Sequence, residues 1–253
     1  MSVPQILLLG ALAGITIFFG LPVARLHLAR TLQGFLSASA TGILIFLLFD
    51  VLQGATSPVN QALVHGNRGT FAADLLALLI GLSVGLLALV FFERRFLRSE
   101  AGTPPSGTSL GYMIAAGIGS HNLSEGLAIG QSAITNHLQL AALLIIGFGL
   151  HNMTEGFGIS APLGGNISWS FIGLAGLIGG GPTFFGTVVG MSFHSNLVYV
   201  LFLALAAGSI IYVLSQLLPI IRRAQAQQLV MTGLVVGFTL AYGTDLVLIA
   251  AGA

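Results

Sequence analysis

Two short segments of the chain repeat one arrangement of side chains that can bind a cation or carry a proton. Residues 121–126 read HNLSEG and residues 151–156 read HNMTEG, so both fit the pattern H-N-x-[ST]-E-G. The second copy begins 30 residues after the first (151 − 121 = 30). Four fixed positions are not expected to repeat by chance in so apolar a chain, and weak internal symmetry of this kind is common in membrane transporters.

In each copy the histidine and the glutamate are four residues apart, which places them on one face of a helix, one turn from each other. Each histidine also lies near the middle of a predicted span, about 18–20 Å from its start at a rise of about 1.5 Å per residue. The short link over residues 135–137 makes the two helices an antiparallel pair, whose faces can meet at one point. The predicted metal ligands are His121, Asn122, Glu125, His151, Asn152 and Glu155.

The chemistry of these side chains indicates a divalent metal ion. Imidazole and carboxylate ligands suit zinc, and also iron, cobalt, nickel, manganese or cadmium. The chain contains no cysteine, which excludes a closed zinc site built from thiolates. The alternative is that these polar residues only hydrogen-bond one helix to another. We favour the metal site, because an ionisable group at the centre of a bilayer costs about 2.5–3.5 kcal/mol on insertion scales, and several at one depth need a compensating role.

Other polar residues of the predicted spans are less informative. Asp50 is either a relay for the metal along the transport path or an interfacial residue, and Gln216 either lines an exit or bonds a neighbouring helix. Asp74 and Asp245 lie near span ends and are expected at the interface. The run 179–182, Gly-Gly-Gly-Pro, is expected to break or kink the sixth span, which is tolerated at membrane depth only where backbone is buried in protein or lines a wet cavity.

The elements that position these residues are predicted to be membrane-spanning helices. Of the 253 residues, 55% are hydrophobic and 6% are charged, whereas a soluble domain carries about 25% charged residues. A span needs roughly 20 mainly apolar residues. The chain therefore predicts one all-α transmembrane domain over residues 1–253, with the first apolar run as a span rather than a signal peptide, and with residues 93–108 as a flexible polar loop. The eight predicted spans are approximately 4–22, 31–54, 70–92, 109–133, 138–160, 167–190, 194–219 and 227–251.

The arginines indicate an orientation in the membrane. Eight spans place only Arg68 on one side, and they place seven arginines on the other, which is then the cytoplasmic side. Those seven are Arg25, Arg30, Arg94, Arg95, Arg98, Arg222 and Arg223. Both termini are then expected outside the cytoplasm, in a multi-pass protein of a prokaryotic cell (inner) membrane. The net charge of +1 offers no basic face for nucleic acid.

On these motifs the chain resembles the ZIP family of zinc- and iron-transporting proteins. Residues 121–126 and 151–156 are similar to the family's motifs in spans four and five, and residues 203–213 are similar to its span-seven segment. Eight spans with both termini outside is the family's layout. The resemblance implies a main metal site formed by His121, Glu125, His151 and Glu155. It also implies that Asn122 and Asn152 belong to a second metal site.

The chain departs from the family pattern at several positions. Ser124 and Thr154 replace the proline that precedes each motif glutamate. Gly181 and Gln216 stand where many members carry a glutamate, Asp50 lies near a frequent histidine of span two, and the long histidine-rich loop after span three is missing. These losses fall on the second metal's ligands, so we expect one well-formed site and a weak or absent second one.

The sequence therefore predicts a transporter of a divalent metal ion, zinc in the first place, and not an enzyme. Alternating access is the expected mechanism and the family resemblance implies inward movement, with metal and protons in competition for the ligands. The expected partners are the metal ion and the lipid bilayer, a homodimer is left open, and no prosthetic group is expected. One rival is a proton-coupled carrier of a small organic solute. The other is an intramembrane metal hydrolase, which would need H-E-x-x-H where each histidine here precedes asparagine.

Overall fold

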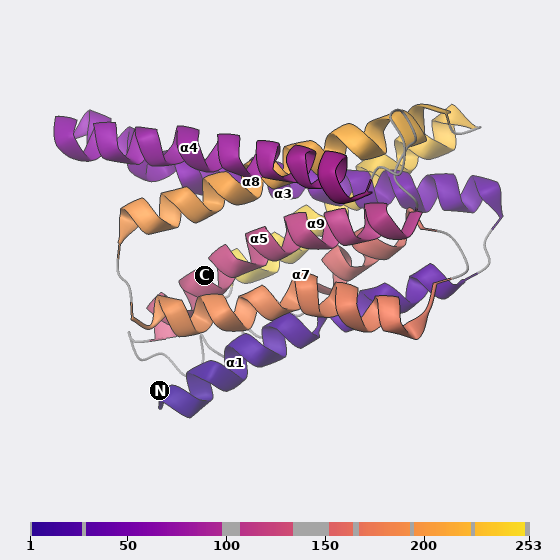
Figure 1. Ribbon diagram of the computed structural model, residues 1–253, viewed down its shortest axis with the longest axis horizontal. Helices are drawn as coiled ribbons and strands as arrows, with labels where there is room; N and C mark the ends of the chain where they lie inside the picture. The colour runs from indigo at the N-terminus through magenta and orange to yellow at the C-terminus, as the bar shows by residue number, and fades with distance from the viewer. Residues whose placement is uncertain are drawn as a thin grey trace.

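The regular structure of this protein is helical wherever the structure describes it (Figure 1). The computed structural model describes residues 2–26, 29–97, 107–133, 152–163, 167–192, 195–223 and 226–250, and no strand occurs in these ranges. Six helices in them are long and apolar enough to cross a membrane, so the chain is a multi-pass helical membrane protein. These six candidate spans are Val3–Val23, Arg30–Val64, Arg68–Arg95, Trp169–Gly190, Asn196–Pro219 and Gln227–Val247.

The first predicted span consists of three consecutive helical pieces. They are α1 (Val3–Ile15), α2 (Ile17–Gly20) and the 3-10 helix η1 (Leu21–Arg25). The interruption falls at Thr16, whose hydroxyl donates to the carbonyl oxygen of Ala13 at 2.5 Å. A side-chain hydroxyl that bonds back to its own helix in this way competes with the regular backbone pattern and often bends the helix.

The second and third predicted spans need correction at their ends. Helix α3 (Arg30–Val64) continues for ten residues beyond the predicted end at residue 54, through Pro58, because Val59 and Ala62 are buried and hold the added turns in place. Helix α4 (Arg68–Phe92) passes into the π-helical turn η2 (Glu93–Leu97). The start of the predicted loop 93–108 is therefore helical.

The later helices follow the predicted order. Helix α5 (Gly107–Ala133) corresponds to the fourth predicted span, but the polar residues of its motif make it too hydrophilic to be counted among the six apolar spans. Residues 152–160 are helical and form the described end of the fifth predicted span, 138–160. Helices α7 (Trp169–Gly190), α8 (Asn196–Arg223) and α9 (Gln227–Ala250) match the last three. Helix α7 continues through Pro182 without a break, which corrects the predicted interruption.

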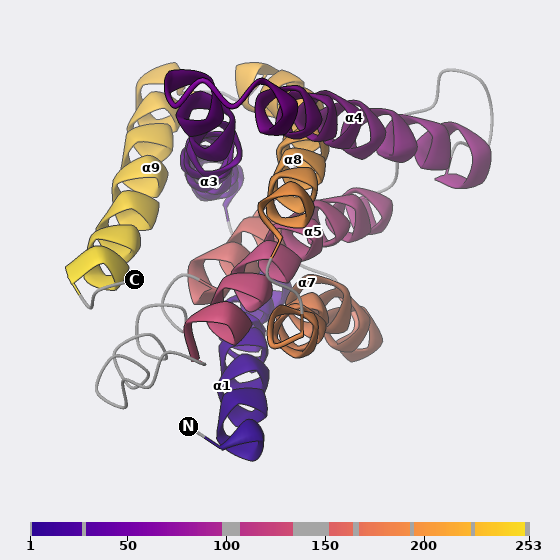
Figure 2. The same cartoon turned by 90° about the vertical axis from the view of Figure 1, so that its left-hand side faces the viewer.

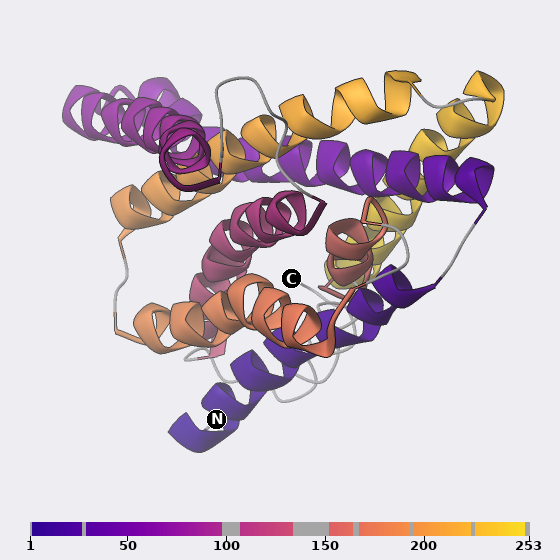
Figure 3. The same ribbon diagram turned by 45° about the vertical axis from the view of Figure 1, so that its right-hand side comes forward.

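The helices pack in two groups. Helix α3 packs against α4, α8 and α9, and these four form the α3 group. Helices α1, α5 and α7 pack against one another, and together with residues 152–160 they form the α5 group. Figure 2 shows α3, α4 and α8 along the top, α9 descending from the top at the left, α5 in the middle, and α7 and α1 below. Figure 3 shows the same arrangement from another side. The main contact between the groups is that of α5 with α8.

Glycines hold each group together by direct contact between backbones. A Cβ atom added at Gly186 of α7 would overlap the carbonyl oxygen of Leu123 in α5, and one added at Gly85 of α4 would overlap that of Leu205 in α8. At the contact between the groups, an added Cβ at Gly117 would instead lie 3.2 Å from the side chain of Val213. Small residues let membrane helices approach closely, so packing is tightest inside the groups and looser between them.

The arginines of the described residues gather at one end of the helices. Helices α1, α4 and α8 run in one direction, and α3, α5, α7 and α9 run in the other (Figure 1). The end of η1, the start of α3, the end of α4 and the end of α8 therefore lie together, and we call this the arginine-rich end. Its described arginines are Arg25, Arg30, Arg94, Arg95 and Arg222. Arg68, at the start of α4, lies at the opposite end.

Candidate metal centre

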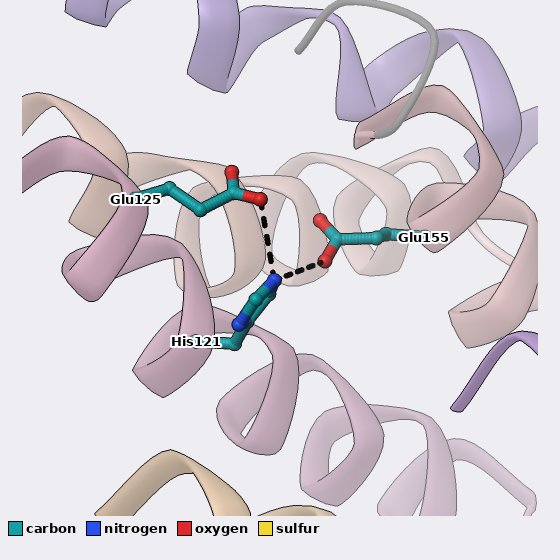
Figure 4. A group of neighbouring side chains, drawn as sticks. All are labelled: His121, Glu125 and Glu155. Atoms are coloured by element: carbon teal, nitrogen blue, oxygen red, sulfur yellow. Dashed lines mark ion pairs between the residues drawn. The ribbon is translucent and has the colours of Figure 1, made fainter. Parts of the chain in front are cut away.

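Three of the predicted ligands meet inside the α5 group. His121 and Glu125 lie one turn apart on α5, with Nε2 of His121 3.2 Å from Oε1 of Glu125. Glu155 reaches the same imidazole nitrogen from the segment 152–160, with its Oε1 3.7 Å away. Figure 4 shows the two carboxylates pointing toward His121 from two different helices. One ligand atom from each of the three residues lies within 4.8 Å of the others, close enough to hold one metal ion.

The cluster is almost completely removed from solvent. His121 is 2% exposed, Glu155 is 0% exposed, and the Glu125 side chain is 10% exposed. Two carboxylates facing one imidazole retain a negative charge even when the imidazole is protonated. Burying uncompensated charge is costly, and the energy cost is removed by a bound cation or by protons. The cluster is therefore built to accept positive charge.

His151 lies outside the described residues, so the structure bears on three of the four histidine and glutamate ligands. Asn152, the next residue, begins the described helical segment and is 0% exposed. Residues 134–150, which include the whole predicted link 135–137 and the start of the fifth span, also lie outside the described ranges.

The two motif asparagines form hydrogen bonds between helices. Asn122 donates its side-chain amide to the carbonyl oxygen of Gly179 in α7 at 2.9 Å, and Asn152 donates to that of Ala13 in α1 at 2.8 Å. Their amide nitrogens thus hydrogen-bond one helix to another, which is the alternative to metal binding that the sequence left open for these residues. The Oδ1 atoms of both residues are buried with no hydrogen-bond partner among the described residues, so each retains one free acceptor.

The motif glycines pack against the same predicted spans as the asparagines, the sixth for Gly126 and the first for Gly156. A Cβ atom added at Gly126 would overlap the carbonyl oxygen of Thr183 in α7, and one added at Gly156 would overlap that of Ile17 in α2. Asparagine and glycine are four residues apart in each motif, as are histidine and glutamate. Each motif therefore has a ligand face and, turned about 100° around the helix, a packing face.

The structure separates the two residues considered for a transport path. Asp50 of α3 lines a cavity of about 290 Å³ together with Gln53, Gly54, Ser57, Tyr199 and Leu203. Its carboxylate also lies near enough to interact electrostatically with His121. Gln216 is partly buried on α8 near the arginine-rich end and does not line this cavity.

Two buried carboxylates were not expected from the sequence. Asp74, predicted at the interface, is 2% exposed and lies in α4 beside the apolar cluster of Val59, Ala77 and Val200. Glu93, predicted in a polar loop, is 3% exposed and accepts a hydrogen bond from the hydroxyl of Tyr212 in α8. The local sequence gives little signal of either, because the covering side chains come from helices distant in the chain.

Comparison with known proteins adds no relative. No protein-family model matches the chain, and no curated protein matches it in sequence. The fold and the site together define a multi-pass helical membrane protein with a buried cluster of one histidine and two glutamates at the middle of its helices.

Proposed function

We propose that this protein carries a divalent metal ion, zinc in the first place, across the membrane, and that it is a distant member of the ZIP family. The observation that carries the proposal is the approach of His121, Glu125 and Glu155 to within 4.8 Å inside the α5 group. Imidazole with two carboxylates is a ligand set that suits zinc and neighbouring transition metals. In this proposal the ion is the substrate, and it crosses the membrane bound to this cluster.

Charge supports a cation as the cargo. A divalent ion balances two carboxylates and a neutral imidazole, which leaves no net charge at the centre of the helices. His121 lies 14 residues from the start of α5, about 21 Å at 1.5 Å per residue, which is near mid-membrane. Ionisable groups at this depth commonly mark a substrate or ion pathway.

The cavity beside Asp50 supports a route to the cluster. On α3, Asp50 is 20 residues from Arg30, about 30 Å from the arginine-rich end, so the cavity lies beyond the cluster and toward the opposite end. A carboxylate in the wall of a cavity raises the local concentration of cations. We assign Asp50 to the outer part of the path.

The two-group packing supports alternating access. Backbone contacts at glycines make each group rigid, whereas side chains separate α5 from α8 at Gly117. Movement of the α5 group along the α3 group would then expose the cluster to one side at a time. The arginine-rich end is the cytoplasmic side in this proposal, and inward movement follows from the family resemblance.

The deciding experiment is uptake of radioactive zinc by proteoliposomes that contain the purified protein. We expect uptake by the native chain and its loss in Glu125→Gln, Glu155→Gln and His121→Ala. The matched controls are Asp74→Asn, a buried carboxylate outside the cluster, and His65→Ala, an exposed histidine at the end of α3. Equal uptake by native and cluster variants would reject metal transport through this site.

A second candidate is a proton-coupled carrier of a small organic solute. It is favoured by the single imidazole nitrogen of His121, which lies 3.2 Å from one carboxylate oxygen and 3.7 Å from another, a geometry that also suits a proton relay. This candidate predicts solute flux in the presence of a metal chelator. Metal uptake that the chelator abolishes would favour the first proposal.

A further inference from the structure

A buried hydrogen bond joins the end of α4 to the body of α8 on the arginine-rich side of the cluster. The Tyr212 hydroxyl donates to the Glu93 carboxylate, and the same hydroxyl oxygen lies 3.5 Å from Sδ of Met113. These side chains are 2%, 3% and 1% exposed, respectively. They come from α8, from the turn η2 after α4, and from α5. The contact therefore connects the two helix groups.

This contact lies between the cluster and the arginine-rich end. Met113 precedes His121 on α5 by eight residues, about 12 Å. Tyr212 is 11 residues from Arg223 at the end of α8, about 16 Å. The cavity of Asp50 lies on the other side of the cluster. In the present conformation one side of the cluster thus has a cavity, and the other is covered by three fully packed side chains.

The hydrogen bond explains why the aromatic ring stays in this position. A buried carboxylate is costly unless it accepts hydrogen bonds, and bonds to charged acceptors are stronger than neutral ones. Glu93 therefore holds the Tyr212 hydroxyl, and the ring is fixed where α8 meets α5. One turn nearer the cluster on α8, the carbonyl oxygen of Ser209 lies 3.6 Å from the position of an added Cβ at Gly117 in α5. The contact between α5 and α8, which we call the seam, therefore continues from Tyr212 toward the cluster.

We propose that Tyr212 and Glu93 form the inner gate of the transport path. The hydrogen bond between them fixes the tyrosine ring in the closed position, and Met113 is the surface of α5 against which the ring closes. Movement of α5 along α8 withdraws Met113 and opens the seam to the arginine-rich side. The role assigned to the gate rests on the proposed transport function, but the closure itself can be measured without transport.

The test uses the absence of cysteine from the chain. A single cysteine introduced as Ser209→Cys lies on α8 one turn from Tyr212, toward the cluster, and the native serine is 3% exposed. The measurement is the rate at which a membrane-impermeant thiol reagent modifies it in reconstituted protein when added from the arginine-rich side. The second substitution in each sample is Tyr212→Phe, Glu93→Ala or Glu93→Gln.

We expect Tyr212→Phe and Glu93→Ala to raise the modification rate by about tenfold, the effect of losing one hydrogen bond to a charged group. Glu93→Gln keeps an oxygen acceptor, so its rate should stay within about threefold of the parent. The matched control cysteine is Ser39→Cys, since Ser39 is also 3% exposed and, like Ser209, bonds back to a carbonyl of its own helix at 3.0 Å. It lies on α3 against α9, away from the seam.

Two results would overturn the gate. One is an unchanged rate at Ser209→Cys in both Tyr212→Phe and Glu93→Ala. The other is an equal rise at Ser39→Cys, which would show general loosening of the fold. The rate of cysteine modification does not depend on a transported ion. Absence of zinc uptake together with the expected modification rates would therefore reject zinc as the substrate but support the closed contact at Tyr212 and Glu93. Normal uptake with unchanged labelling would reject the gate and keep the transporter.

Discussion

The side-chain amide of Asn122 donates to the carbonyl oxygen of Gly179, 57 residues later in the chain, at 2.9 Å. Asn152 makes the equivalent bond to Ala13 at 2.8 Å. One motif position thus attaches α5 to α7, and its counterpart attaches the segment 152–160 to α1. The repeat in the sequence is a repeat in packing as well as in ligands.

Removal of these amides should destabilise the fold. We expect Asn122→Ala and Asn152→Ala each to lower the free energy of unfolding by about 0.5–1.5 kcal/mol, because each removes one buried hydrogen bond between two helices. Thermal unfolding in detergent measures the change, with Gln53→Ala as a control at a polar residue of the cavity wall. Unchanged melting temperatures would contradict the role in packing and would favour a role for the asparagines as metal ligands.

Zinc should bind with a stoichiometry of one ion per chain. The side-chain amide nitrogens of Asn122 and Asn152 donate hydrogen bonds to backbone carbonyls. Gly181 has no side chain at the position where many members of the ZIP family, which the chain resembles, carry a glutamate. Isothermal titration calorimetry and metal analysis of dialysed protein measure the ratio. Two tightly bound ions per chain would refute the single site.

The two glutamates of the cluster should contribute strongly to zinc affinity. We expect Glu125→Gln or Glu155→Gln to weaken binding by roughly 30-fold or more, since removing one partner of a buried charged pair costs about 2–5 kcal/mol. The same titration measures it, and Asp74→Asn should bind zinc as the native chain does. Equal losses in all three variants would point to misfolding rather than to ligands.

The motif glycines should not tolerate a methyl group. Gly126→Ala and Gly156→Ala place a Cβ against a backbone carbonyl of the neighbouring helix, and overpacking of this kind costs about 1–3 kcal/mol. Gly173→Ala is the control, because nothing lies within 4 Å of its added Cβ in the second turn of helix α7. That control should be neutral or stabilising by up to about 1 kcal/mol. Similar unfolding of all three would contradict the close approach.

Asp50 should affect the apparent affinity for zinc more than the maximal rate. We expect Asp50→Asn to raise KM for uptake several-fold with little change in kcat, because the residue lines the cavity and is not among the three clustered ligands. Initial uptake rates at several zinc concentrations separate the two constants. A fall in kcat alone would place Asp50 in the movement of the carrier instead of the approach of the ion.

Local patterns in the sequence predict the helices and bring together candidate ligands, whose role as a metal site stays a prediction. Low charge and long apolar runs identify the spans, and a four-residue spacing places His121 and Glu125 on one face. The structure confirms a membrane protein with six long apolar helices and brings Glu155 to the same point. The full count of eight spans and the side of the termini stay predictions.

Features that depend on tertiary contacts could not be predicted. The sequence around Glu93 reads as a charged loop, whereas in the structure its buried carboxylate accepts a hydrogen bond from Tyr212, 119 residues later. Asp74 looks interfacial in the sequence, yet it is 2% exposed in α4, a helix that packs against α3 and α8. One missed signal was local: asparagine and glycine four residues apart in both motifs already define a second face of each helix.

The division of each motif into two faces has a mechanical consequence. The packing faces fasten α5 to α7 and the segment 152–160 to α1, whereas the ligand faces bring His121 and Glu155 together across the space between these pairs. Under the proposed function, a bound ion links the α5–α7 pair to the pair formed by α1 and the segment 152–160. When the ion leaves, the two carboxylates repel each other and the contact between the two pairs is weakened. The loaded carrier would then be the stiffer body and the empty one the more deformable. The presence or absence of the ion at the cluster would therefore determine how rigid the protein is in the loaded and in the empty half of its transport cycle.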